Sequence, residues 1–135
     1  MSPFPAIPRI SVTAAVVLLL AAAGCGGNSL APFQPQVSNA ADNFQLQATG
    51  VTDVTTTLVY TWPNSGTRAT INHATSTTAG TTLVVIKDNA GATVYSHALA
   101  ASLNEPTTAG QAGTWTITVT LTNYSGTLSL RAQKL

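Results

Sequence analysis

The stretch Thr114–Thr122 limits the possible folds more than any other part of the chain. It reads Thr-Trp-Thr-Ile-Thr-Val-Thr-Leu-Thr, so apolar side chains and threonines alternate without a break. An alternation of period two matches an extended strand, whose successive side chains point to opposite faces of a sheet. The apolar face of such a strand must be covered by other apolar side chains. The sequence therefore predicts a sheet with one buried and one wet face, and it places Trp115 in the core.

The rest of the chain after Phe44 divides into similar short runs and shows no helical periodicity. These runs are rich in threonine and β-branched residues, and Gly, Asn, Asp or Pro separates them. The predicted strands are 44–48, 54–62, 67–73, 83–87, 92–97, 114–122 and 127–132. Asn123–Gly126 and Asp88–Gly91 are expected to close hairpins, because their residues favour turns. The run 83–87 is apolar on both faces, which is typical of a strand with neighbours on both sides.

About seven short strands with regularly spaced turns predict an all-β fold. We expect a single antiparallel β-sandwich of the jelly-roll or Ig-like type, with a small barrel as the alternative. The second half of the chain resembles the jelly-roll domains of the P-domain and pre-peptidase C-terminal kind, which are appended to secreted peptidases. The matching features are the apolar strand Leu83–Ile86, the turn residues Asp88 and Gly91, Tyr95, and Gly113–Trp115. This resemblance implies an architecture and no particular activity.

The first 24 residues have the layout of an export signal. Arg9 precedes an apolar run, Ile10–Ala23, of 14 residues. A transmembrane helix needs roughly 20 residues, so this run is too short to span a bilayer, and it ends at small residues without a charged flank. We therefore expect residues 1–24 to be a signal peptide that directs the chain out of the cytoplasm.

Cys25 is the only cysteine of the chain. The sequence Leu20-Ala-Ala-Ala-Gly-Cys25 around it resembles the lipobox of bacterial lipoproteins. The resemblance implies cleavage before Cys25, recognition through Ala22, Ala23 and Gly24, and a lipid on the cysteine thiol. The alternative is an ordinary signal peptide cleaved after Ala21–Ala23, which leaves a free thiol. A free thiol in an oxidising compartment is reactive, whereas a thioether is inert, and this favours the lipoprotein.

The predicted organisation is a signal peptide (1–24), a lipid-anchored flexible tether (25–40) and a β-sandwich domain (41–135). Residues 26–36 are rich in Gly, Pro and polar residues without periodicity, as is typical of a flexible linker. The expected location is the bacterial cell envelope, attached to a membrane and facing the periplasm or exterior.

Charge is sparse, at 7% of residues. Once Arg9 is removed with the signal, four basic residues balance four acidic ones, and neither type is clustered. Nucleic acid and anionic membrane surfaces are therefore not expected as electrostatic partners. The predicted contact with the membrane is through the lipid, and the other partner is an unidentified protein or glycan.

The residues suited to catalysis or metal binding are few and scattered. A nucleophilic hydrolase needs a base, which only His73 or His97 could supply, and neither lies in a recognisable motif. The four carboxylates fall on turns and termini, and Asp88 fits a tight turn better than a calcium site. We expect no catalytic residue, no metal ion and no cofactor. A small hydrolase is the least favoured function.

The leading functional hypothesis is a non-catalytic binding or envelope-accessory module. The alternative is a glycan-binding module that stacks sugars on exposed aromatic rings. Trp62, at a strand end beside Pro63, and Tyr124, in a predicted turn, are the candidate rings. Trp115 is assigned to the core by its strand phase.

Overall fold

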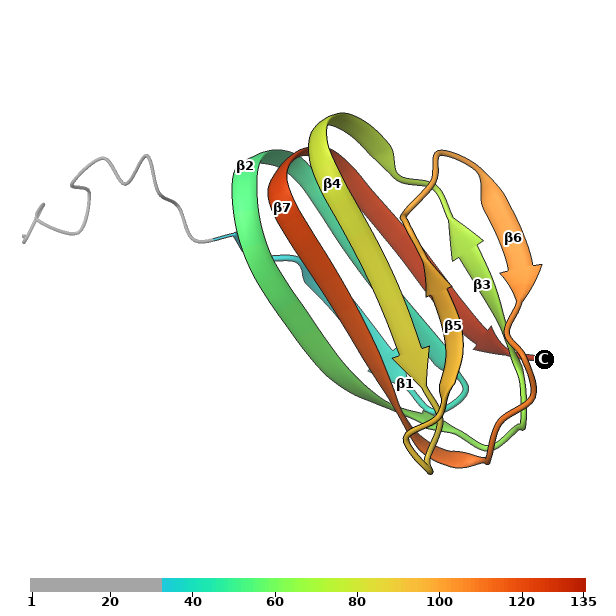
Figure 1. Ribbon diagram of the computed structural model, residues 1–135. Coiled ribbons are helices and arrows are strands. Elements are labelled where there is room, and N and C mark those ends of the chain that lie inside the picture. Colours follow the sequence, from blue (N-terminus) through green and yellow to red (C-terminus); the bar gives the residue numbers. More distant parts are fainter. Residues whose placement is uncertain (1–32) are drawn as a thin grey trace, which may run out of the picture. The chain divides into compact units, whose positions relative to one another are not determined.

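The computed structural model describes residues 33–135, and every regular element in this range is a β-strand. The seven strands are antiparallel, which confirms the all-β prediction. They are β1 (Gln36–Ala40), β2 (Asn43–Asn64), β3 (Ala69–His73), β4 (Ser76–Lys87), β5 (Thr93–His97), β6 (Leu103–Pro106) and β7 (Gly113–Lys134). Figure 1 shows their arrangement.

Two strands of 22 residues each, β2 and β7, pair along nearly their whole length and organise the sheet. The first part of β2 pairs with β1 on one side and with the last part of β7 on the other. That part of β7 also pairs with β3, and β3 pairs with β6. The second part of β2 pairs with the first part of β7. That part of β7 also pairs with β4, and β4 pairs with β5. The two long strands are therefore shared by two different groups of neighbours.

The long strands bend sharply between these two groups. Irregularities in register fall between Ala48 and Thr56 of β2 and between Thr77 and Thr81 of β4. Figure 1 shows β2, β4 and β7 arching over at the same end of the domain. Because of this bend, the rings of Phe44 and Tyr60 lie only 5.4 Å apart. Sixteen residues of straight strand would separate them by about 50 Å, so β2 must double back on itself.

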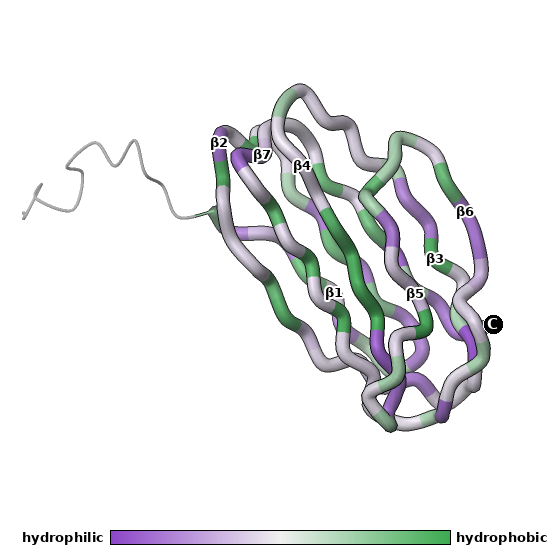
Figure 2. Tube along the Cα trace, in the orientation of Figure 1, coloured by the Kyte–Doolittle hydropathy of each residue, from purple (hydrophilic) through white to green (hydrophobic). Residues whose placement is uncertain are grey.

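The buried side chains of both groups form one core. Its members include Trp62, Trp115, Ile117 and Leu130, all with no exposed surface. Alternation along β7 places Trp115, Ile117, Val119 and Leu121 in this core, as the sequence predicts. Figure 2 shows the hydrophobic stretch of β4, which pairs with β5 on one side and β7 on the other, as predicted for a strand apolar on both faces.

The predicted hairpin at Asn123–Gly126 is wrong, because the chain continues through it as a single strand. Asn123 has a φ of 46° and Gly126 a φ of 143°, so both residues depart from extended geometry. However, β7 keeps both of its neighbouring strands within this segment: β2 pairs with it through Val54↔Tyr124, and β4 pairs with it through Thr77↔Gly126. The local turn signal produces a bend across three strands instead of a chain reversal.

Other boundaries also differ from the prediction. The predicted strands 44–48 and 54–62 are both parts of β2, and β1 and β6 are strands that the sequence pattern does not predict. Strand β1 lies within the stretch 25–40 that the sequence assigns to the tether. The hairpin closed by Asp88–Gly91 is confirmed, since β4 and β5 pair directly across it. The total of about seven strands is thus right, although its members differ.

Candidate functional site

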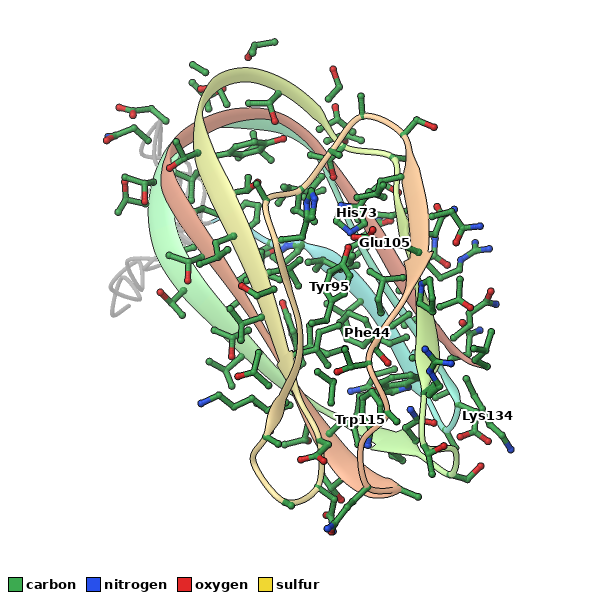
Figure 3. The ribbon with its side chains drawn as sticks, turned by 45° about the vertical axis from the view of Figure 1, so that its right-hand side comes forward. Phe44, His73, Tyr95, Glu105, Trp115 and Lys134 are labelled. Atoms are coloured by element: carbon green, nitrogen blue, oxygen red, sulfur yellow. The ribbon has the colours of Figure 1, made fainter. Side chains whose placement is uncertain are left out.

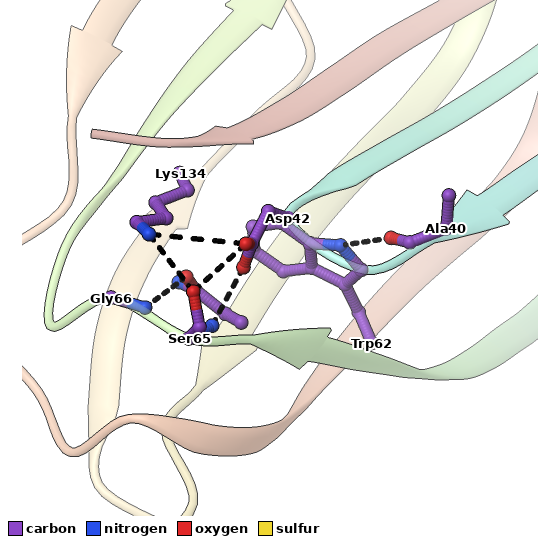
Figure 4. A network of polar contacts seen from close by, with 7 residues as sticks. Ala40, Asp42, Trp62, Ser65, Gly66 and Lys134 are labelled. Carbon is purple, nitrogen blue, oxygen red and sulfur yellow. Dashed lines mark hydrogen bonds and ion pairs between the residues drawn. The ribbon is translucent and has the colours of Figure 1, made fainter.

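Among residues 33–135, the candidate sites are three polar clusters and a groove with its extension. The first cluster lies where the turn between β1 and β2 meets the last residues of β2 and β7. Asp42, with a φ of 64°, accepts hydrogen bonds from the Ser65 backbone N–H (2.7 Å) and the Ser65 hydroxyl (2.8 Å). Lys134 Nζ donates to the Ser65 hydroxyl at 2.9 Å and lies 3.9 Å from the Asp42 carboxylate (Figure 4).

The pKa of Asp42 is lowered mainly by the hydrogen bond from the Ser65 backbone and then by the one from the Ser65 hydroxyl. The charge of Lys134 lowers it further. Backbone bonds join the same segments, from Asp42 N–H to the Pro63 carbonyl and from Lys134 N–H to the Asp42 carbonyl. Both charged side chains are at least a third exposed. Exposed ion pairs of this kind contribute little to stability. The cluster therefore ties the end of β7 to the two ends of β2.

The second cluster joins His73, Tyr95 and Glu105 in the interior, from three different strands (Figure 3). His73 Nε2 lies 2.8 Å from the Tyr95 hydroxyl, which donates to Glu105 Oε1 at 2.8 Å. The backbone N–H of Ala100 donates to His73 Nδ1 at 3.1 Å. His73 is only 2% exposed.

These contacts fix the tautomer of His73. Nδ1 accepts a hydrogen bond, so a neutral ring carries its proton on Nε2, from which it donates to the Tyr95 oxygen. Burial and the neighbouring His97 lower the pKa of His73, while Glu105 opposes the shift. Burial, and then the hydrogen bond to Glu105, raise the pKa of Tyr95. The Tyr95 hydroxyl thus links His73 to Glu105, and the backbone of Ala100 satisfies the remaining ring nitrogen of His73.

The third cluster surrounds Asp88, which lies at the first position of the predicted turn and is 5% exposed. Its Oδ1 accepts from the backbone N–H groups of Ala90 and Ala92, and its Oδ2 accepts from Gln111 N–H. The hydrogen bond from Gln111, and then those within the turn, lower the pKa of Asp88. The carboxylate thus fastens the segment before β7 to the hairpin of β4 and β5. Among the described residues, no cluster of three or more His, Cys, Asp or Glu residues could hold a metal ion.

The groove, which we call the amide groove, lies on the polar face of β1, β2 and β7. It has a volume of about 230 Å³. Its lining residues are Gln34, Gln36, Gln47, Ala48, Thr49, Thr127, Leu128 and Ser129. Gln36, Gln47 and Ser129 form one row across the three strands, because each is the register partner of the next. A second groove of about 180 Å³ continues along β1 and β2 and shares Gln36 and Gln47.

The amide groove is lined by uncharged side chains throughout the part of the chain that the structure describes. Gln34, Gln36 and Gln47 are exposed. Each amide offers two N–H donors and a carbonyl acceptor, so the surface suits a neutral ligand that both donates and accepts hydrogen bonds. The alternating glutamines Gln34, Gln36, Gln45 and Gln47 are visible in the sequence. The sequence does not predict that these glutamines lie side by side, because residues 34–40 fall in the predicted tether.

The structure does not place the predicted aromatic rings on the surface. Trp62 and Tyr124 have no exposed surface, so the prediction that they are open for stacking is wrong. Trp62 packs edge-to-face on Trp115, with ring centroids 5.9 Å apart, and its Nε1 donates to the Ala40 carbonyl. Tyr124 donates its hydroxyl hydrogen bond to the Ser76 carbonyl. Both rings carry a polar atom, but in each case the protein backbone satisfies it.

The predicted lipidation site Cys25 and the cleavage residues Ala22, Ala23 and Gly24 lie outside the described residues. Across residues 33–135, no helix has the length and hydrophobicity needed to span a membrane.

No family model matches the chain, and no curated protein matches it significantly.

Proposed function

We propose that this chain is a non-catalytic binding module of the bacterial cell envelope, held at a membrane by a lipid on Cys25. The observation that carries the binding role is the amide groove, an uncharged hollow in which exposed glutamines from β1 and β2 meet hydroxyls of β7. Its ligand is a neutral, polyhydroxylated molecule, and the best candidate is a glycan. The partner is recognised by hydrogen bonds instead of charge.

The fold of this module is a two-layer β-sandwich of the jelly-roll or Ig-like type. The contact between Phe44 and Tyr60 supports this assignment, because it requires the two parts of β2 to face each other. A rigid sheet suits recognition, since strands hold polar side chains at fixed spacings and lose little freedom when a ligand binds.

A non-catalytic role is supported by the state of the buried polar groups. A hydrolase would need a nucleophile and a base that open onto a substrate site. His73 and Glu105 do come together through Tyr95, but His73 is buried and both of its ring nitrogens are engaged. Neither residue lines the amide groove or the groove beside it. The cluster is best explained as a satisfied part of the core.

The membrane anchor is tested by changing the proposed lipidated residue. In full-length protein expressed in a bacterium, Cys25→Ser is expected to move the protein from the membrane fraction to the soluble or unprocessed fraction. The physical reason is that each buried CH₂ of an acyl chain contributes about 0.8 kcal/mol to membrane attachment. Fractionation and mass spectrometry of the mature N-terminus provide the measurement. A wild-type protein whose mature N-terminus is not a modified Cys25 would refute the anchor.

Glycan binding is tested by removing amides from the groove. Gln36→Ala combined with Gln47→Ala is expected to weaken binding of neutral oligosaccharides by about tenfold or more, at about 1.4 kcal/mol for each factor of ten. The probes are neutral hexose and N-acetylhexosamine oligosaccharides, first on an array and then in calorimetric titration with the full-length protein. Gln133→Ala is the matched control, because Gln133 is an exposed glutamine of β7 outside the groove.

Two outcomes would contradict the proposal. Glycan binding that survives the double substitution would rule out the amide groove as the binding site. A hydrolytic turnover that His73→Gln or His97→Gln abolishes would show that the protein is an enzyme.

A further inference from the structure

Within residues 33–135, the outer edge of β2 is open over Thr56–Tyr60. From Thr56 to Asn64, β2 pairs with β7 on one side only. Strand β1 pairs with β2 at Asn43–Gln47 and does not extend along this stretch. Within the described residues, no strand pairs with the other edge of Thr56–Tyr60.

The backbone groups at this edge can be assigned from two neighbouring hydrogen bonds. The Thr61 carbonyl accepts from Asn39 Nδ2 at 2.7 Å, and the Pro63 carbonyl accepts from Asp42 N–H at 2.8 Å. Both carbonyls therefore point away from β7. In an antiparallel strand, residues two apart point their N–H and C=O groups to the same edge. Because β2 keeps a continuous register with β7 from Thr56 to Asn64, Thr57 and Val59 point their N–H and C=O groups to the open edge, where no backbone group of the described residues pairs with them.

The proline at position 63 agrees with this assignment. Proline lacks an N–H, so within a sheet it is tolerated where the N–H would face away from the neighbouring strand. Pro63 has the same phase as Thr57 and Val59. This edge therefore already contains one proline without losing its pairing to β7.

The side chains at this edge do not prevent another strand from approaching. Residues 54–62 (Val-Thr-Thr-Thr-Leu-Val-Tyr-Thr-Trp) contain no charge, no proline and no glycine. Val59 is 61% exposed, more than any other large hydrophobic side chain on a strand of the described chain. Natural proteins usually protect open edges with charges, prolines or bulges, and residues 56–60 have none of these.

We propose that this edge pairs with the same edge of a second copy of the chain. A two-fold axis at Leu58 would place Thr57 opposite Val59 of the second copy and Val59 opposite its Thr57. Each of these two residue pairs would exchange two backbone hydrogen bonds, so the short ladder would contain about four. The strand order would then continue from β4 and β7 through β2 into β2, β7 and β4 of the other copy.

A second copy fits this edge better than a charged partner, because the edge offers no charge to recognise and a neutral strand does not repel itself. Two other edges, those of β5 and β6, are less suitable. The Val94 carbonyl of β5 is occupied by Thr108 N–H, and β6 carries Glu105 and ends at Pro106. The contact area is small, so the dimer is expected to be weak in solution. Confinement to a membrane surface would raise the effective concentration of its two copies.

The test is sedimentation of the full-length protein in density-matched detergent over a range of concentrations. Wild-type protein is expected to show a concentration-dependent dimer. Thr57→Pro removes one donor from each copy and is expected to raise the dissociation constant about tenfold or more, while β2 keeps its pairing with β7. Thr57→Val is the matched control, since it changes the same side chain and retains the N–H.

A second variant keeps the test decisive if Thr57→Pro does not fold. Val59→Lys places a charge at the open edge and is expected to abolish the dimer. Thr118→Lys places the same charge on the cross-strand partner of Val59 inside the sheet, and it is expected to weaken association less. A wild-type protein that stays monomeric at every concentration would overturn the proposal. Dimers that persist in folded Thr57→Pro and Val59→Lys would also overturn it, because another surface must then form them.

Discussion

Replacement of Gly126 by alanine is expected to lower the free energy of unfolding by about 4 kcal/mol, from strained backbone geometry and overpacking together. Gly126 lies in the bend of β7 with a φ of 143°. Residues with a Cβ rarely adopt this backbone conformation. A Cβ at this position would overlap the carbonyl oxygen of Ser76 and would lie 2.9 Å from the Tyr124 hydroxyl. Ser76 and Tyr124 are hydrogen-bonded to each other, so neither can move without disturbing the core.

Denaturant unfolding followed by circular dichroism provides the measurement. Gly50→Ala is the matched control, because Gly50 also has a positive φ, of 63°, but no atom lies within 4 Å of the position that a Cβ would occupy there. It is expected to cost only about 1 kcal/mol. Equal losses for the two substitutions would show that β4 and β7 do not approach closely at the bend.

Replacement of Trp115 by alanine is the second change with a large expected effect, a loss of about 3–5 kcal/mol. Trp115 has no exposed surface and packs edge-to-face on Trp62, its register partner across β2 and β7. Its Nε1 donates to the Gln111 carbonyl at 2.8 Å. Alanine would therefore leave a cavity and remove the indole hydrogen bond, so that the Gln111 carbonyl keeps only the longer bond from Asn89 N–H, at 3.4 Å. Single domains are usually stable by about 5–15 kcal/mol, so this loss would leave little margin.

Thermal and urea unfolding of Trp115→Ala and Trp115→Phe would measure the effect. Phenylalanine keeps most of the apolar volume and loses only the indole N–H and part of the ring, so we expect it to be clearly less destabilising than alanine. A loss below about 1 kcal/mol for Trp115→Ala would contradict a packed core around the two tryptophans.

The sequence predicts the strands well where a local pattern reports burial directly. The alternation at Thr114–Thr122 identifies β7 and the burial of Trp115, because one side of that strand faces the core. The turn at Asp88–Gly91 is also predicted correctly. The hydrogen bonds that close it lie within the turn, where the Asp88 side chain accepts from the N–H groups of Ala90 and Ala92.

The same local reasoning fails where a sequence segment is compatible with two different backbone conformations. Asn123–Gly126 contains residues that suit a tight turn, but it can equally form a bend within a longer strand. The choice depends on whether neighbouring strands continue past it, and those neighbours, β2 and β4, come from distant parts of the sequence. Strand β1 is missed for a related reason, since an exposed polar strand of five residues carries no hydrophobic pattern.

The candidate sites show the same division. Tyr124 follows a turn-like residue, which predicts a place on the surface, yet the bend of β7 directs its ring into the core. His73, Tyr95 and Glu105 are separated by 22 and 10 residues along the chain, and no spacing predicts their contact. The amide groove likewise needs Gln36, Gln47 and Ser129 to be aligned by the register of three strands.

By itself, the sequence determined that this chain forms an all-β domain and which face of its clearest strand is buried. These features follow from side-chain alternation, which is a property of consecutive residues. Only the tertiary structure decided that β2 and β7 bend and double back, that Trp62 and Tyr124 are buried, and that an uncharged groove and an open edge remain. The reason is that pairing between distant segments sets each of these features, and a local pattern does not specify its partner.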